Sequence, residues 1–314
     1  MESTRSEEFH VYTFAPLLNF HTDAPEIKMA DGCVIGPPSD AEIQWCKAPA
    51  YGWMPELWPT CSCVIRTGIQ KIHETEILSG GKFGTPWFGL SSMGQITKVR
   101  NSLRLFRRGD VGCGPRYTML PGTSEPGFHA QGDNTFPCDL SKAYTISIQE
   151  APLFSAFYDK FRFFDFDKHP EVQIAVLRFC LSYEVGWLYQ PIDLMIGFEA
   201  LYLGDEQELA YKLATRASYL LGETPDRRLH IYRVLRKAYS IRSKLVHGEK
   251  DIDKVKTEKG KYIPINEFLS EVQDVLRESI NRFMALAAKY SHKQLLQTAL
   301  DDNVINGGNL LSQT

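Results

Sequence analysis

The sequence has no long apolar run, no strong excess of one charge and no dense set of cysteines. No stretch reaches the roughly 18 uncharged apolar residues of a membrane span. The start, MESTRSEEFHVYTF, has no apolar segment behind basic residues. The seven cysteines are odd in number and scattered over 314 residues, which favours reduced thiols over a disulfide framework. We therefore expect a soluble cytoplasmic protein that is not attached to a membrane.

The motifs of several common enzyme classes are also missing. The chain has no phosphate-binding glycine loop ahead of a helix, no Gly-x-Ser-x-Gly elbow and no pair of carboxylates at metal-binding spacing. Cys61 and Cys63 lie too close together for the usual zinc spacing, although Cys33, Cys46 or His73 could join them in space. Ordinary thiols are the commoner outcome, so we expect neither a metal nor a cofactor.

The composition changes along the chain and predicts an α+β protein of two domains. Residues 1–150 are rich in proline and glycine, with short β-prone runs such as FHVYTF, SCVIRTGI and AYTISIQ. We expect a strand-rich domain there, which senses a trigger or positions a substrate. Residues 151–170 are an aromatic-rich connector, residues 171–292 favour helices that pack as an antiparallel all-α bundle, and residues 293–314 are a polar tail that frays or docks.

Two apolar patterns support this division. In the connector, Phe154, Phe157, Tyr158 and Phe161 fall at helical spacing. Such rings could stack on bases, but packing in a core or between domains is their commoner use. The last segment of the bundle has an apolar stripe that recurs every three or four positions and predicts a helix; it is formed by Ile265, Phe268, Leu269, Val272, Val275, Leu276, Ile280 and Phe283.

Positive charge is concentrated in one segment, although the whole chain has a net charge of -3. Residues 225–247 hold seven basic residues and one acid, Asp226, which leaves +6. Such a helix faces an anionic partner or balances an acidic neighbour. A second basic run, KVRNSLRLFRRGD, could follow an RNA backbone, but a solvated basic face is the commoner outcome; its arginines are Arg100, Arg104, Arg107 and Arg108.

Arg242 and His247, in AYSIRSKLVHGEK, are the strongest candidate for a catalytic pair. An arginine followed closely by a histidine occurs at three other places, beginning at Arg5, Arg66 and Arg162, but only the pair at 242 and 247 lies in a long basic helical segment. Five residues rotate the two side chains by about 140° on an ideal helix. They could meet in a groove if the helix ends at Gly248, or converge from two chains across a twofold axis.

These two residue types suit the cleavage of RNA without a metal. A guanidinium holds the phosphate and stabilises the added negative charge of the transition state. An imidazole, with a pKa of about 6.5, takes the proton of the ribose 2'-hydroxyl or protonates the departing 5'-oxygen. Ser243 and Lys244 could hold phosphate oxygens nearby, and the exposed basic positions are candidate contacts to the RNA backbone; these are Arg233, Arg236 and Lys237.

A purely structural role is the commoner outcome for these residue types and this spacing alone. The helix dipole favours a histidine in the last turn. An arginine on a charged helix is usually solvated or ion-paired.

A resemblance to a known family favours the catalytic interpretation. The segment YSIRSKLVHG, preceded by DLMIGFEALYLGDEQELAYKLATRASYLLG, resembles the HEPN family, specifically its Apea-like branch. Members carry a glutamate in a FEALYL-type context, then a helix like A-x-R-A, then a tyrosine and IRS-x-x-VHG at the end of the active helix. The resemblance runs from about Ile192 to Gly248 in the same order, and it does not cover residues 1 to about 170.

The resemblance implies a helical bundle, usually dimeric, and a metal-independent endoribonuclease whose Arg-x4-His pair is Arg242 and His247. The polar residue after the arginine matches Ser243, while Glu199 and Tyr239 match residues that support the site. Related proteins act in phage defence by abortive infection or as toxins, so we expect RNA as substrate, with tRNA as one candidate, a second copy of the chain, and a phage-derived trigger or an antitoxin. Some members only bind, which leaves a catalytically silent RNA-, nucleotide- or partner-binding module as the alternative.

Overall fold

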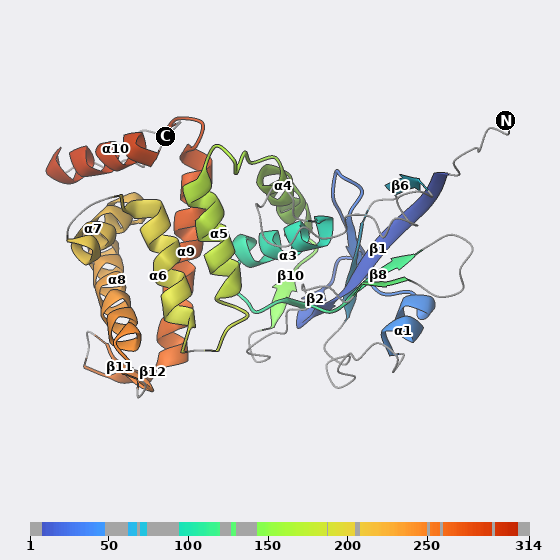
Figure 1. Cartoon of the computed structure of the whole chain (residues 1–314), viewed down its shortest axis with the longest axis horizontal. Coiled ribbons are helices and arrows are strands. Elements are labelled where there is room, and N and C mark those ends of the chain that lie inside the picture. The colour runs from blue at the N-terminus through green and yellow to red at the C-terminus, as the bar shows by residue number, and fades with distance from the viewer. Residues whose placement is uncertain are drawn as a thin grey trace, which may run out of the picture. The chain divides into compact units, whose positions relative to one another are not determined.

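The chain folds into two compact units, Met1–Phe164 and Asp165–Thr314. The computed structural model describes residues 8–47, 62–67, 70–73, 94–119, 127–129, 143–186, 188–204, 208–249, 252–257, 260–290 and 293–306. The first unit contains the large sheet and the second is predominantly helical (Figure 1), which confirms the predicted α+β class. The division between the units falls inside the segment 151–170.

The sheet of the first unit is built around one long strand, β1 (Glu8–Leu18). The sheet order is β3-β4-β5-β1-β8-β9, and β6 and β7 also pair with β1. Phe14 lies opposite Arg66 of β5 and opposite Tyr117 of β8, so β1 is hydrogen-bonded on both edges. The other strands of this sheet are β3 (Ile27–Lys28), β4 (Val34–Gly36), β5 (Cys63–Arg66), β6 (Gln70–His73), β7 (Gly112–Cys113), β8 (Arg116–Met119) and β9 (Gly127–His129).

The three β-prone runs expected from the sequence each contribute a strand. Aromatic and β-branched residues pack well on a pleated surface, and these runs give β1, β5 and β10 (Tyr144–Ile146). Strand β10 pairs in parallel with β2 (Phe20–Thr22), and the rings of Tyr144 and Phe20 stack at 5.7 Å. The register therefore fixes the end of the first unit against its beginning.

Three helices of the first unit are described: α1 (Asp40–Lys47), α3 (Gln95–Phe106) and α4 (Ala151–Arg162). Helices α3 and α4 pack on each other, and apolar side chains from both join the buried core of the sheet. In α4, Phe154, Tyr158 and Phe161 are buried, and Phe157 packs against Phe106. Core packing, the commoner use of these rings, is confirmed.

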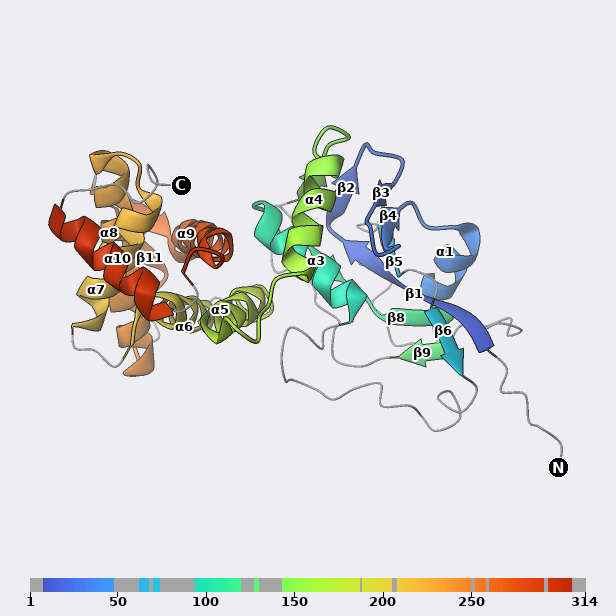
Figure 2. The ribbon, with the colours of Figure 1, turned by 90° about the horizontal axis from the view of Figure 1, so that it is seen from above.

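The second unit is a set of helices with one small hairpin, as Figures 1 and 2 show. Helix α5 packs along α6 and α7 packs along α8, while α9 contacts α5, α6, α7 and α8. Its elements are α5 (Pro170–Leu181), α6 (Gln190–Tyr202), α7 (Leu209–Leu221), α8 (Pro225–Val246), β11 (Lys254–Lys256), β12 (Tyr262–Pro264), α9 (Ile265–Leu286) and α10 (Lys293–Asn306).

Helix α9 supplies much of the core of this unit, and its predicted apolar stripe is confirmed because all eight side chains are buried. A glycine in α6 lets the two helices approach closely. A Cβ atom added at Gly197 would lie 2.9 Å from a methyl carbon of Leu276. The hydroxyl of Tyr202 donates to Ser279 Oγ at 3.0 Å, which satisfies a buried polar group at the same interface.

The tail begins with helix α10, which docks on α7. Leu296 and Leu300 are buried. Arg216, buried in α7, donates to both carboxylate oxygens of Asp301 at 2.8 Å and to the carbonyl oxygen of Tyr202 at 2.6 Å. Of the two outcomes expected for the tail, docking is therefore the correct one over residues 293–306.

Candidate functional site

The candidate site lies on α8, whose start and direction follow from its sequence. Thr224 caps the helix by accepting a hydrogen bond from the Arg227 N–H, and Pro225 occupies the first helical position, where its missing N–H costs nothing. The apolar face packs toward α7, α6 and α9; it consists of Ile231, Val234, Leu235, Ala238 and Ile241. The remaining faces of α8 carry the basic residues.

Several of these cations are engaged within the chain, and two are not. Arg227 pairs with Glu278 of α9 at 3.1 Å, and Arg228 donates to the Gly222 carbonyl at 2.8 Å. By contrast, Arg236 and Lys237 are exposed, and neither has a hydrogen bond or ion pair within the described residues. The exposed positive charge of α8 therefore concentrates around its middle turns.

Arg242 is held partly inside the protein, beside α6. Within the described part of the chain, its Nε atom is buried and donates no hydrogen bond. Its guanidinium carbon lies 6.0 Å from the centre of the Tyr239 ring, which is the outer limit of a cation–π contact. The terminal N–H groups of this half-buried residue are not among the buried atoms, so they are the part of the guanidinium that an anion can reach.

Glu199 of α6 acts on Arg242 through its charge. The two residues are 43 positions apart in sequence, and the packing of α6 on α8 brings them near each other. Burial raises the pKa of the Glu199 carboxyl above its ordinary value, and the positive charge of Arg242 opposes that rise. The structure therefore brings together three of the predicted site residues: Glu199, Tyr239 and Arg242.

His247 lies at the end of α8, where the chain leaves the helix. Gly248 has φ +93°, its N–H donates to the Leu245 carbonyl at 3.0 Å, and the Glu249 N–H donates to the Lys244 carbonyl at 3.0 Å. This is a Schellman cap, so the helix does end at Gly248, which was the condition for Arg242 and His247 to meet in a groove of one chain. The His247 side chain is exposed.

Arg242 and His247 do not meet within one chain. No hydrogen bond or ion pair joins them among the residues that the structure describes. The helix continues to Val246, so the rotation of about 140° between the two positions applies. Of the next residues, Ser243 is half-buried, and Lys244 pairs with Glu249 at 3.0 Å.

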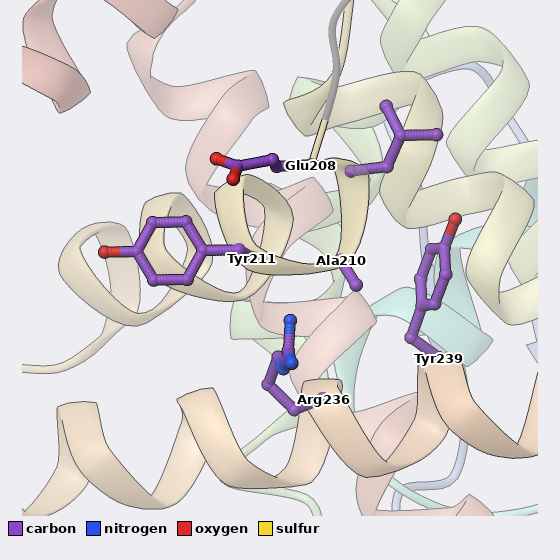
Figure 3. A pocket seen from close by; sticks show the side chains of 6 residues that line it. Glu208, Ala210, Tyr211, Arg236 and Tyr239 are labelled. Atoms are coloured by element: carbon purple, nitrogen blue, oxygen red, sulfur yellow. The ribbon is translucent and has the colours of Figure 1, made fainter.

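A hollow of about 520 Å³ lies beside this site, between the first turn of α7 and the middle of α8. Figure 3 shows the Arg236 guanidinium pointing from α8 toward α7, with the rings of Tyr211 and Tyr239 on opposite sides of it. Its lining is Glu208, Leu209, Ala210, Tyr211, Arg236 and Tyr239. Sequence reasoning missed Glu208 and Tyr211, because only the docking of α7 on α8 places them near Arg236.

The second basic run, residues 98–110, does not form an exposed basic face. Arg100 and Arg104 are buried in α3, and the Arg104 Nε donates to the Val111 carbonyl at 3.2 Å. Arg107 pairs with Glu150 at 2.9 Å. The four arginines therefore form neither an RNA-binding stripe nor a solvated basic face, because Arg100 and Arg104, the two that lie in α3, are buried.

The zinc alternative rests largely on residues outside the description. Cys61 and the side chains of Cys46 and His73 fall there, while Cys33 and Cys63 are buried and form no disulfide among the described residues. Among the described residues, no three His, Cys, Asp or Glu side chains gather in a way that could hold a metal ion. None of the helices in the same part of the chain is long and apolar enough to cross a membrane.

Comparison with known proteins assigns no function to this site. The chain matches no family model, no curated protein and no solved structure.

Proposed function

We propose that this protein is a metal-independent endoribonuclease of the Apea-like HEPN type. The observation that carries the proposal is the state of Arg242: a half-buried guanidinium next to Glu199, with a buried Nε that donates no hydrogen bond within the described residues. An exposed His247 ends the same helix. A phosphodiester would bind the terminal N–H groups of this half-buried guanidinium, and the imidazole would provide the proton transfer.

The proposed reaction uses the RNA as its own nucleophile. The 2'-oxygen attacks the phosphorus atom as its proton leaves for a base, and the bond to the 5'-oxygen breaks as that oxygen gains a proton. Arg242 binds the phosphate oxygens and stabilises the charge that develops on them. His247 carries one of the two protons. The products are a 2',3'-cyclic phosphate and a 5'-hydroxyl, and DNA is not cut because it lacks the nucleophile.

We assign the complete site to two chains. Arg242 and His247 point about 140° apart on one helix, so we propose that a second copy supplies one of the two groups that meet the phosphate. A symmetric dimer with α8 at the interface would do this. Four buried cysteines that form no disulfide among the described residues suit the reducing cytoplasm that we propose as the location; they are Cys33, Cys63, Cys113 and Cys180.

The proposed setting is phage defence by abortive infection, or a toxin. In either setting the first unit senses the trigger or positions the RNA, and a phage-derived trigger or an antitoxin controls the activity. Binding of labelled RNA to the full chain, with and without a candidate trigger, tests this assignment.

Cleavage assays in EDTA test the proposal directly. Wild type, Arg242→Ala and His247→Ala are incubated with labelled tRNA and total RNA, and the RNA ends are mapped. We expect each substitution to lower the cleavage rate at least about 100-fold. Arg227→Ala and His230→Ala are matched controls on the same helix, because these residues pair with Glu278 and Glu271 of α9. Equal cleavage by all five proteins, or cleavage only after metal is restored, contradicts the proposal.

A binding module without turnover is the second candidate. The exposed Arg236 and Lys237 and the hollow beside them could supply affinity for RNA without any chemistry. In that case RNA binds, its ends stay intact, and binding survives His247→Ala. An interaction scaffold of a third kind would dimerise without any salt-dependent affinity for RNA.

A further inference from the structure

The hollow between α7 and α8 contains groups that the cleavage reaction does not use. Arg236 extends into it from α8 and has no hydrogen bond or ion pair within the described residues. Tyr211 is 51% exposed, so much of its ring faces solvent. The volume of about 520 Å³ falls within the range of about 300–1,000 Å³ that is typical of small-molecule sites.

These groups match the parts of a nucleotide. A guanidinium binds a phosphate through two parallel hydrogen bonds. Tyrosine rings stack on a base of any kind, since every base has a π face. The carboxylate of Glu208 accepts hydrogen bonds only, so it suits ribose hydroxyls and repels a second phosphate. An apolar peptide would leave both Arg236 and Glu208 without partners.

We infer that this hollow binds one nucleotide, with its base against Tyr211 and its phosphate on Arg236. The nucleotide is a unit of the RNA substrate or a free mononucleotide, and for the RNA source this inference rests on the proposed function. Position supports the first source. Tyr239 lines the hollow, and its ring centre lies 6.0 Å from the Arg242 guanidinium carbon, so the hollow adjoins the proposed phosphate site.

Along α8, phosphate-binding and stacking groups alternate in the way that phosphates and bases alternate in a strand of RNA. Arg236, Tyr239 and Arg242 follow one another at intervals of three residues, which turns each by about 60° from the last along one track of the helix. A strand of RNA following this track would meet a phosphate-binding group, a stacking ring and a second phosphate-binding group. The hollow would thus select the nucleotide next to the cleaved bond.

Equilibrium binding to the full chain tests this inference without any need for cleavage. Two probes are used in EDTA: a fluorescent RNA tetranucleotide, and adenosine 5'-monophosphate followed by tyrosine-ring NMR shifts. For the RNA probe every protein carries His247→Ala, so the RNA stays intact. Tyr211→Leu and Arg236→Gln should each weaken binding about tenfold. Tyr211→Phe should restore it, because the ring is kept.

Matched controls separate the hollow from general charge and exposure. Tyr262→Leu removes a tyrosine that is 62% exposed on β12. Lys237→Gln removes the same charge as Arg236→Gln from the neighbouring position, which does not line the hollow. Neither should change binding of the mononucleotide more than about twofold. Lys237→Gln should lower RNA affinity equally with an intact or an abasic residue in the probe, whereas Tyr211→Leu should abolish the advantage of the intact base.

The outcomes distinguish the two sources and the two proposals. Losses with the tetranucleotide alone identify a unit of RNA, and losses with the mononucleotide, with or without RNA, identify a free nucleotide as well. If Tyr211→Leu and Arg236→Gln bind both probes as tightly as their parent, the inference is overturned, even when wild type cuts RNA. Absence of cleavage by wild type would instead overturn only the proposed function.

Discussion

Among single side chains, Glu199 shows most directly how burial and charge compete at the site. The carboxyl is half-buried in α6, which raises its pKa, while Arg242 nearby favours the ionised form. Burial is the larger effect, so the folded protein holds the Glu199 proton more tightly than the unfolded chain does. An ionised Glu199 therefore costs stability, although it helps to hold the guanidinium in place.

Glu199→Gln should reveal this cost as a dependence of stability on pH. The folded chain binds more protons at this carboxyl than the unfolded chain, so the wild type loses stability as pH rises from about 4.5 through the raised pKa. Relative to the wild type, the glutamine variant should gain stability over that window and stay ahead at pH 7. Urea unfolding at pH 4 and pH 7 measures it, with Glu278→Gln as the control for loss of one exposed negative charge. A variant that is less stable only at pH 7 contradicts the expectation.

The sequence predicted a residue's role where a family resemblance covered it, and failed where the role depended on contacts with other elements. The family resemblance pointed to Glu199 and Arg242 together, and the structure brings them near each other although they are 43 positions apart. The buried Arg104 was missed, because helical spacing is the same for arginines in water and for arginines that bind interior carbonyls such as that of Val111. The hollow could not be foreseen either, since Tyr211 and Arg236 belong to different helices.

Among the elements, the end of α8 places His247 through the backbone conformation of one glycine. Gly248 adopts φ +93°, and among the residues that the structure describes a Cβ atom at this position would meet nothing within 4 Å. A side chain there is therefore disfavoured by backbone strain rather than by a clash, at a cost of about 1 kcal/mol. The cap fixes where the helix stops, and hence where the imidazole lies.

Gly248→Ala should lower both stability and RNA cleavage. The expected loss of stability is about 1 kcal/mol, and cleavage should fall because the last turn of α8 shifts. Gly260→Ala is a matched control, since Gly260 has φ +77° in the turn between β11 and β12 and is equally open. Its stability should drop by a similar amount while cleavage stays near wild type. If both variants lost cleavage equally, the loss in Gly248→Ala would not come from the cap of α8, and the expectation would be contradicted.

A long-range ion pair joins α10 to α7, and the sequence of α10 alone does not predict it. Arg216 is 4% exposed and donates to both oxygens of Asp301, so removing the acid leaves a buried charge without its main acceptor. Asp301→Ala should cost about 2 kcal/mol and speed amide hydrogen exchange across residues 293–306. Glu278→Gln breaks the more exposed pair with Arg227 and should cost under about 1 kcal/mol. If amide hydrogen exchange in α10 stayed unchanged, the burial of Leu296 and Leu300 would be enough to keep the helix docked.

Helices and strands could be predicted from apolar periodicity only where the periodic pattern was long. Helix α9 has 22 residues, and its apolar stripe identified it correctly as a helix. Strands β11 and β12 have three residues each, so their alternation is too short to stand out from a charged loop. The tail could not be assigned because the contacts of α10 are with α7, including the bond from Arg216, some 85 residues earlier.

For the whole molecule, the decisive property is whether two chains share one site. On a single α8 the half-buried Arg242 and the exposed His247 point about 140° apart. In a symmetric dimer, a site made of Arg242 from one chain and His247 from its partner would occur twice. A dimer of one Arg242→Ala chain and one His247→Ala chain would then keep one complete site and lose both groups from the other.

Mixing the two inactive variants should therefore restore cleavage. With equal amounts and free exchange, half of the dimers are mixed and each has one complete site of two, so the rate should reach about a quarter of wild type. Each variant alone, at the same total concentration, is the control, and sedimentation confirms that the mixture is dimeric. A mixture of folded, dimeric variants that stays inactive would mean that both groups act from the same chain. The helix would then have to unwind beyond Arg242 to bring the imidazole to the phosphate, at the cost of the cap that Gly248 now completes.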